Sequence, residues 1–335
     1  MPMNFRTALS IPAFPFKISH KDTLLSIGSC FAEHIGGRLT ALKINHLLNP
    51  FGIVYNPISI AAQLEALLSA KIFSESDLFE NQGLWHSFVH HGSFSGLNQI
   101  ETLAKINLSL QQAQERLPSV TRLFLTFGTA HVFILKESDQ IVANCHKMPG
   151  TIFQKRRLAV EEIKSAFLPV LQQLKSQNAD LQIIFTVSPV RHIRDGLIEN
   201  QRSKATLLLA IDAICQELDF AHYFPAYELI LDDLRDYRFF AADMIHPSDV
   251  AIDYVWQQFR HAFFTEDTQD LIRQIEAILQ AGKHRPFHSQ SDQHQAFVEK
   301  QLGKIKQLKS AYPYLNFEKE QADFILNRKE ENSEL

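Results

Sequence analysis

The first 264 residues alternate short apolar runs with longer amphipathic stretches. The apolar runs have the length of buried strands, and they occupy residues 24–27, 44–48, 122–127, 181–187 and 222–228. Between them, apolar positions recur at helical spacing in residues 30–39, 59–70, 97–116, 160–177 and 200–218. This alternation predicts an α/β fold, a doubly wound parallel sheet of about five strands flanked by helices. Ligands of such sheets bind beyond the carboxyl ends of the strands.

The pattern changes at residue 265, where charged amphipathic helices replace the strands. We therefore divide the chain into a sheet domain, residues 1–264, and a helical C-terminal extension, residues 265–335. Within the extension, residues 284–294 are predicted to be a polar loop and residues 328–335 a frayed tail.

Composition places the chain among ordinary globular proteins. Of its 335 residues 45% are apolar and 21% charged, and the net charge of −4 provides no basic field for nucleic acid. Three cysteines (Cys30, Cys145 and Cys215) form no disulfide framework, which favours a reducing compartment. No apolar run approaches the roughly 18 residues of a membrane span, and the start lacks a secretory pattern. We expect a cytoplasmic protein without nucleic-acid or membrane partners; its oligomeric state stays unknown.

The first chemical signal is the turn Gly28-Ser29-Cys30, which directly follows the first predicted strand. The helix that begins there presents unsatisfied N–H groups and a positive dipole end, and both favour negative charge developing beside Ser29. Ser29 therefore suits a catalytic nucleophile. A serine before a helix is equally typical of a plain N-cap, so this turn alone leaves both interpretations open.

The second signal is Asp243-x-x-His246, followed by proline. One turn that carries both residues can present the imidazole to a serine while the carboxylate orients the ring and stabilises its protonated form. Together with Ser29, these two residues predict a Ser-His-Asp triad.

The residues from Gly28 to Ala32 spell GSCFA, which matches the signature of the GSCFA family. The chain thereby resembles a branch of the SGNH/GDSL hydrolases over about residues 5–264. The resemblance implies a flavodoxin-like sheet and cofactor-free hydrolysis of an ester, acylated carbohydrate being one such substrate. It also implies that backbone N–H groups of Ser29 and Gly52 hold the oxyanion.

One departure from that pattern concerns the oxyanion hole. SGNH hydrolases usually carry Gly-x-Asn-Asp after the third strand, where this chain has Gly-Thr-Ala-His at residues 128–131. His131, Thr129 or Asn144 is therefore a candidate for the second oxyanion donor. Arg191 follows the fourth strand at the same edge and suits a substrate carboxylate or sulfate-like group.

Three alternatives remain open at this point. Cys30 would be the better nucleophile as a thiolate, although free cysteines are commonly buried. The missing Gly-x-Asn-Asp favours a binding protein that recognises an acyl or glycan group without turnover. A metal-dependent hydrolase would use His86, His90 and His131, but the glycine and serine content of residues 85–96 favours a loop, and we predict no metal.

Overall fold

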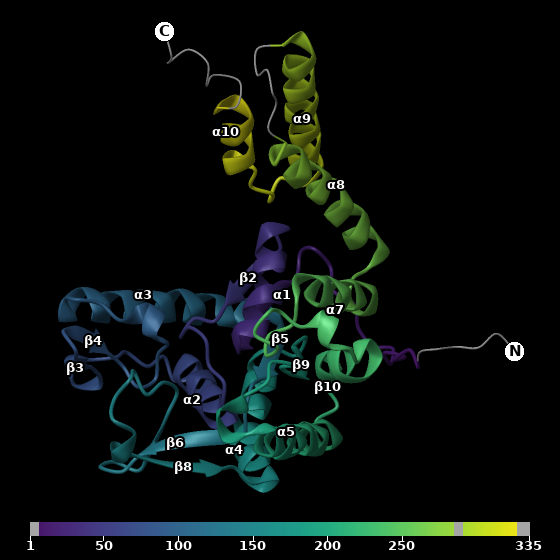
Figure 1. The fold of residues 1–335 in the computed structure, drawn as a ribbon. Coiled ribbons are helices and arrows are strands. Elements are labelled where there is room, and N and C mark those ends of the chain that lie inside the picture. The colour runs from purple at the N-terminus through teal and green to yellow at the C-terminus, as the bar shows by residue number, and fades with distance from the viewer. Residues whose placement is uncertain (1–6, 285–290, 327–335) are drawn as a thin grey trace, which may run out of the picture.

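The computed structural model describes residues 7–284 and 291–326, and its centre is a five-stranded parallel sheet in the order β10-β9-β5-β1-β2 (Figure 1). In chain order this is the flavodoxin-like sequence 2-1-3-4-5, so the winding reverses between β1 and β5. The predicted fold class is confirmed. The strands are β1 Thr23–Gly28, β2 Asn45–Leu48, β5 Val120–Phe127, β9 Gln182–Val187 and β10 Ala221–Tyr223.

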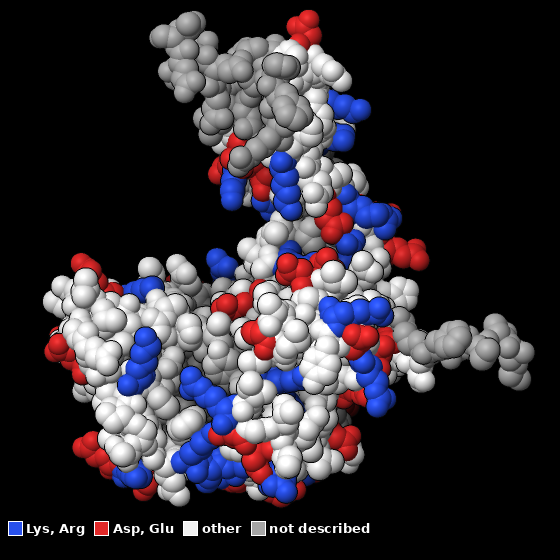
Figure 2. Space-filling view, viewed as in Figure 1, with Lys and Arg blue, Asp and Glu red and all other residues white. Residues whose placement is uncertain are grey.

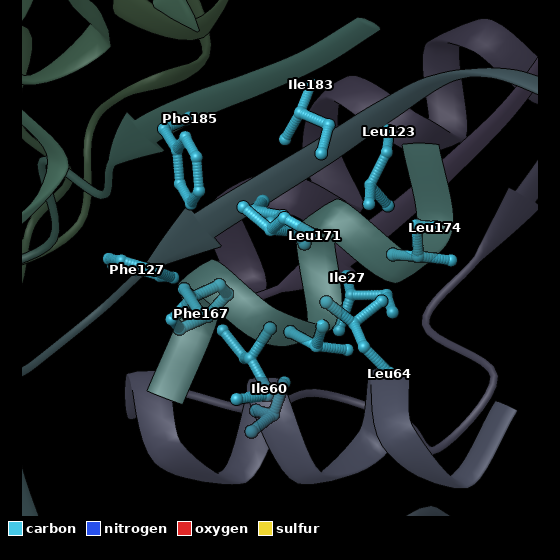
Figure 3. Close-up of a cluster of buried hydrophobic side chains, with 14 of the residues drawn as sticks. Ile27, Ile60, Leu64, Leu123, Phe127, Phe167, Leu171, Leu174, Ile183 and Phe185 are labelled. Carbon is cyan, nitrogen blue, oxygen red and sulfur yellow. The ribbon is translucent and has the colours of Figure 1, made fainter. Parts of the chain in front are cut away.

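Helices cover both faces of the sheet because alternate strand residues point to opposite sides. Leu123 and Leu125 pack with one set of helices, whereas Phe124 packs with the other. The first face is covered by α2 Pro57–Leu68, α4 Val160–Gln177 and α5 Leu197–Glu217, and Figure 3 shows part of this core. The second face is covered by α1 Cys30–Ala41, α7 Asp249–Phe263 and the segment Leu229–Leu234.

An insertion beside the sheet forms a second lobe, at the left of Figure 1. Residues 131–142 form a hairpin, and a third strand pairs with it in the antiparallel order β7-β6-β8. The elements of this lobe are β3 Phe79–Asn81, β4 Leu84–His86, α3 Gln99–Arg116, β6 His131–Leu135, β7 Gln140–Val142 and β8 Phe153–Arg157.

The C-terminal helices are α8 Glu266–Gly282, α9 Asp292–Ala311 and α10 Glu318–Leu326, and they stand above the sheet domain in Figure 1. An ion pair of 2.6 Å between Lys43 Nζ and Glu320 Oε1 connects them to the sheet domain. His294 lies in α9 rather than in the predicted loop, because Ser291 caps the helix before it. The remainder of that loop (285–290) and the predicted tail (328–335) lie outside the described residues. Among residues 7–284 and 291–326, no helix has the length and hydrophobicity to cross a membrane.

Gly28 ends β1 directly beside Thr126 of β5. A Cβ at this position would lie 2.4 Å from the Thr126 carbonyl oxygen and 2.7 Å from Thr126 Cβ. The neighbouring strand therefore excludes any side chain at the residue that delivers Ser29 to the sheet edge.

Substituting Gly28 with alanine should lower the free energy of unfolding by about 1–3 kcal/mol, because a buried strand must shift to admit the methyl group. Gly37→Ala is the matched control. It lies inside α1 with open space around its Cβ direction, so alanine there should stabilise the protein by about 0.5–1 kcal/mol. Urea unfolding of both variants measures the difference, and equal stabilities would contradict the steric argument.

Candidate active site

A cavity of about 600 Å³ opens beyond the carboxyl ends of β1, β5 and β9. This position lies at the reversal of winding, where doubly wound sheets bind their ligands. Its wall combines loops of the sheet domain with β6–β8 of the insertion. Its lining includes Cys30, Tyr55, Asn56, His91, Thr129, His131, Phe133, Asn144, Cys145, Lys155, Arg191, His192, Arg194, Asp195, Ile245 and His246.

The predicted Asp243–His246 pair forms. The Asp243 Oδ2 to His246 Nδ1 distance is 2.7 Å, and Asp243 Oδ1 accepts the backbone N–H groups of Ile245 and His246 at 2.9 and 3.0 Å. Hydrogen bonds from the backbone and ring of His246 and the backbone of Ile245 lower the pKa of Asp243 to about 2. The ionised carboxylate holds the proton on Nδ1, which leaves Nε2 as the acceptor on a ring that lines the cavity.

Ser29 directly precedes α1 but does not cap it with its side chain. The residue is only 1% exposed, and within residues 7–284 and 291–326 its Oγ has no hydrogen-bond partner. We expect the His246 imidazole to approach the Ser29 hydroxyl at about hydrogen-bond distance, or somewhat looser without a ligand, and the structure, which holds no ligand, shows no hydrogen bond between them. The next residue, Cys30, lines the same cavity as His246, so the Ser29 turn and the imidazole meet at one site.

Cys30 is a poor candidate for the nucleophile. Burial, the largest cause, raises the pKa of its thiol above the ordinary value. The reactive form of cysteine is the thiolate, which a raised pKa disfavours at neutral pH.

Gly52 does not present a free N–H to the cavity. Its N–H donates to the Asn49 carbonyl at 2.7 Å, and its φ of +78° places it in a tight turn. A Cβ there would lie 2.4 Å from His91 Cβ, so close packing explains this glycine. The prediction that Gly52 supplies an oxyanion donor therefore does not match the observed hydrogen bonding.

The other three predicted binding residues, His131, Asn144 and Arg191, all line the cavity. Asn144 Oδ1 accepts the backbone N–H of His146 at 2.9 Å, and no partner for Asn144 Nδ2 is found among the described residues. Burial is the main cause that lowers the pKa of His131, which favours a neutral ring. Asn144 Nδ2 is thus a side-chain donor that a ligand in the cavity can use.

Arg191 also holds the turn that carries the His-Asp pair. Its backbone N–H donates to Ile245 O at 3.3 Å, and its guanidinium lies 3.5 Å from Met244 O. The same guanidinium stacks over Phe240, 4.2 Å from the ring centroid. The loop after β9 is thereby fastened to the late turn, although more than fifty residues separate them.

Comparison with known proteins identifies the family. The sequence profile of the GSCFA family matches residues 23–259, which is most of the chain. The chain belongs to the GSCFA family. The profile described as "GSCFA domain protein, C-terminal domain" matches residues 275–325. No curated protein matches the sequence.

Among solved structures, an acetyl xylan esterase from the rumen bacterium Butyrivibrio proteoclasticus is similar to this GSCFA chain, with 13% identity and a TM-score of 0.36. The match covers 72% of this chain and 63% of that chain. The GSCFA chain thus spans less than two thirds of the esterase it is compared with.

A buried lysine at the ends of two central strands was not foreseen from the sequence. Lys204 in α5 is 1% exposed, and its Nζ donates to the carbonyl oxygens of Gly128 and Ser188, both at 2.6 Å. These carbonyls follow β5 and β9, so the side chain joins the ends of two neighbouring strands. The available signal was a lysine at helical spacing from the apolar residues Leu207 and Ile211, which are buried on the same helix.

We expect Lys204→Met to lose more stability at pH 9 than at pH 6. Burial lowers the pKa of Lys204 to about 7, against 10.5 for an ordinary lysine. Between those values the unfolded chain binds a proton that the folded chain lacks, so this lysine makes folding more favourable as pH rises. Urea unfolding at both pH values measures the effect. Lys164→Met is the control, because the hydrogen bond from Lys164 in α4 to Glu217 raises the pKa of this lysine and keeps it protonated at both pH values. It should show no such dependence, and equal losses at the two pH values for Lys204→Met would contradict the argument.

Three buried histidines of the insertion, His86, His90 and His146, make local hydrogen bonds. His86 Nδ1 lies 2.7 Å from Ser95 Oγ, His90 Nδ1 lies 3.0 Å from Ser87 Oγ, and His146 Nε2 lies 2.8 Å from Ser87 O. Burial lowers the pKa of His90 to about 3. Within the part of the chain that the structure describes, no three His, Cys, Asp or Glu residues are arranged to hold a metal ion.

Proposed function

We propose that this GSCFA protein is a serine ester hydrolase that cleaves small acyl or acetyl esters. The observation that supports this most is the Asp243–His246 pair, whose imidazole lines the same cavity as Cys30, the residue that adjoins Ser29. A base with its orienting carboxylate, together with a serine at a helix N-terminus, is the set of groups that acyl transfer needs.

In the proposed reaction Ser29 Oγ attacks the ester carbonyl carbon while His246 Nε2 takes the hydroxyl proton. The tetrahedral intermediate collapses, its C–O bond to the alcohol breaks, and His246 returns the proton to the departing alcohol. Water then attacks the acyl-serine with His246 again as base, which releases the carboxylic acid and restores Ser29. Asp243 stays ionised throughout and stabilises the imidazolium.

The Ser29 N–H, expected to be an oxyanion donor, donates to Thr126 O at 3.3 Å instead. Oxyanion stabilisation is therefore assigned to the next N–H, that of Cys30 at the start of α1, and to Asn144. Cys30 occupies the first helical position, where a backbone N–H has no partner within the helix. Asn144 Nδ2 is the second donor we propose, in place of the asparagine that usually follows the third strand. A cavity wall of histidine, arginine, threonine and asparagine suits an ester of a hydroxyl-rich alcohol, so acylated carbohydrate is the proposed substrate.

A binding role without turnover is the second candidate. It is favoured by the buried Ser29 hydroxyl, which has no partner in the part of the chain that the structure describes, and by the Gly52 N–H, which donates within its own turn. Catalysis requires the Ser29 hydroxyl and His246 Nε2 to approach each other when substrate binds, whereas binding alone does not.

A panel of 4-nitrophenyl esters from acetate to octanoate, assayed with the full chain, separates the two roles. We expect turnover, with the shorter acyl chains preferred. A fluorophosphonate probe should label the protein, and mass spectrometry should locate the adduct on Ser29. Saturable ester binding without turnover or labelling would instead establish the binding role.

A further inference from the structure

The charged side chains around the cavity are mostly cationic. Lys155, Arg191 and Arg194 line it, whereas Asp195 is the one acidic residue in its lining. Within the lining itself, three cations against one carboxylate leave an excess of two positive charges. The Asp243 carboxylate, which contacts His246 but does not line the cavity, is engaged by the His246 ring and by two backbone N–H groups. Figure 2 shows Lys and Arg side chains gathered over the region where β8 and α5 lie in Figure 1, with acidic side chains among them.

The single carboxylate is already paired, because Asp195 Oδ1 forms an ion pair with Lys155 Nζ. Neither Arg191 nor Arg194 has a carboxylate partner within residues 7–284 and 291–326. This differs from Arg202, just outside the cavity, which pairs with Glu199. Two guanidinium groups are therefore available to a ligand.

The geometry of Arg191 leaves donors open. Its flat face covers Phe240, and one N–H group approaches Met244 O. A guanidinium has five N–H donors at its edge, so most of them remain for an anion, which it can hold in a bidentate manner. The backbone bond from Arg191 to Ile245 places this group beside the turn of His246.

The neighbouring imidazoles do not oppose an anion. Burial lowers the pKa of His192 to about 4 and is the main cause that lowers the pKa of His131. Both rings are neutral at pH 7, and both line the cavity. A neutral imidazole has one N–H group, so each ring can donate a hydrogen bond to a carboxylate.

We propose that the ester substrate carries a carboxylate, which Arg191 and Arg194 bind beside the reacting ester group. This inference rests on the proposed function and adds the class of substrate: an acyl ester of an acidic alcohol, such as an acylated acidic sugar, or the half-ester of a dicarboxylic acid. In both cases the substrate carboxylate would bind the guanidinium groups of Arg191 and Arg194.

Two matched substrate pairs test the proposal and distinguish these sources. 4-Acetoxybenzoate and its methyl ester differ by a carboxylate on the alcohol side, whereas mono-4-nitrophenyl adipate and 4-nitrophenyl hexanoate differ on the acyl side. We expect kcat/KM for the anionic member of at least one pair to be about tenfold higher. The advantage should shrink when NaCl is raised to 0.5 M, because salt screens exposed charges.

Arg194→Gln should lower the ratio of anionic to neutral kcat/KM, while Arg202→Gln, the matched control, should preserve it. A neutral substrate preferred in both pairs, or a ratio unchanged by Arg194→Gln, would overturn the proposal. If the wild type hydrolyses no ester, the proposed function fails and calorimetric titration decides the anion site separately. Glucuronate that binds the wild type, with glucose and Arg194→Gln as negative controls, would then support the site, and no binding would reject it.

Discussion

Ser29→Ala is expected to lower ester hydrolysis by at least about a thousandfold and to leave the stability of the protein almost unchanged. The rate should fall because no acyl-enzyme can form without the hydroxyl. Stability should hold because Ser29 Oγ makes no hydrogen bond to any described residue and does not cap α1. Removing a buried polar atom that has no partner costs little, since no interaction is lost. Initial rates with 4-nitrophenyl acetate and a thermal unfolding curve measure the two quantities.

Cys30→Ala is the control for this experiment. It changes the neighbouring side chain on the same cavity wall, and we expect it to retain most of the activity. Activity that survives in Ser29→Ala but disappears in Cys30→Ala would move the nucleophile to the thiol. Loss of folding in Ser29→Ala would show that the hydroxyl has a structural role that its missing hydrogen bonds do not reveal.

His246→Ala should have the second largest effect, a loss of at least about a hundredfold in kcat, because it removes the group that accepts the serine proton. The imidazole is about half exposed, so its removal should change the unfolding midpoint little. Stopped-flow or steady-state rates at pH 7 measure the loss. A rate within a few fold of the wild type would exclude His246 as the base.

Asp243→Asn probes the same pair from the other side. The amide oxygen can still accept the N–H groups of Ile245 and His246, so the turn should persist. The amide nitrogen, however, would face His246 Nδ1 with a donor and favour the tautomer whose Nε2 carries the proton. That tautomer cannot accept the serine proton, so we expect a smaller but clear loss of kcat. Since the pKa of Asp243 is about 2, its own protonation cannot explain a loss of activity above pH 4.

The sequence alone was sufficient for the class of fold. Strands in a parallel sheet are buried on both faces, so their continuous apolar runs are visible along the chain, and the helices between them repeat at 3.6 residues. The Asp243–His246 pair could also be predicted, because the two residues lie three positions apart in one turn and local backbone geometry brings their side chains together. Ser29 could be placed at the end of β1 for the same reason, since Gly28 marks where the chain leaves the sheet.

Tertiary structure decided the hydrogen-bond partners and the contacts of the residues at the site. The Gly52 N–H is used by Asn49, and only the folded turn with His91 beside it shows this. Lys204 was hidden for a similar reason: its partners are backbone carbonyls of Gly128 and Ser188, and no sequence pattern marks which carbonyls end near a given helix. The cavity itself depends on contacts between distant segments, as when Arg191 holds the loop of Ile245. Local sequence spacing therefore determines the strands, the helices and the His-Asp turn. Which N–H groups are free to donate, which charged side chains are buried and which residues line the cavity are decided only when separate strand ends come together.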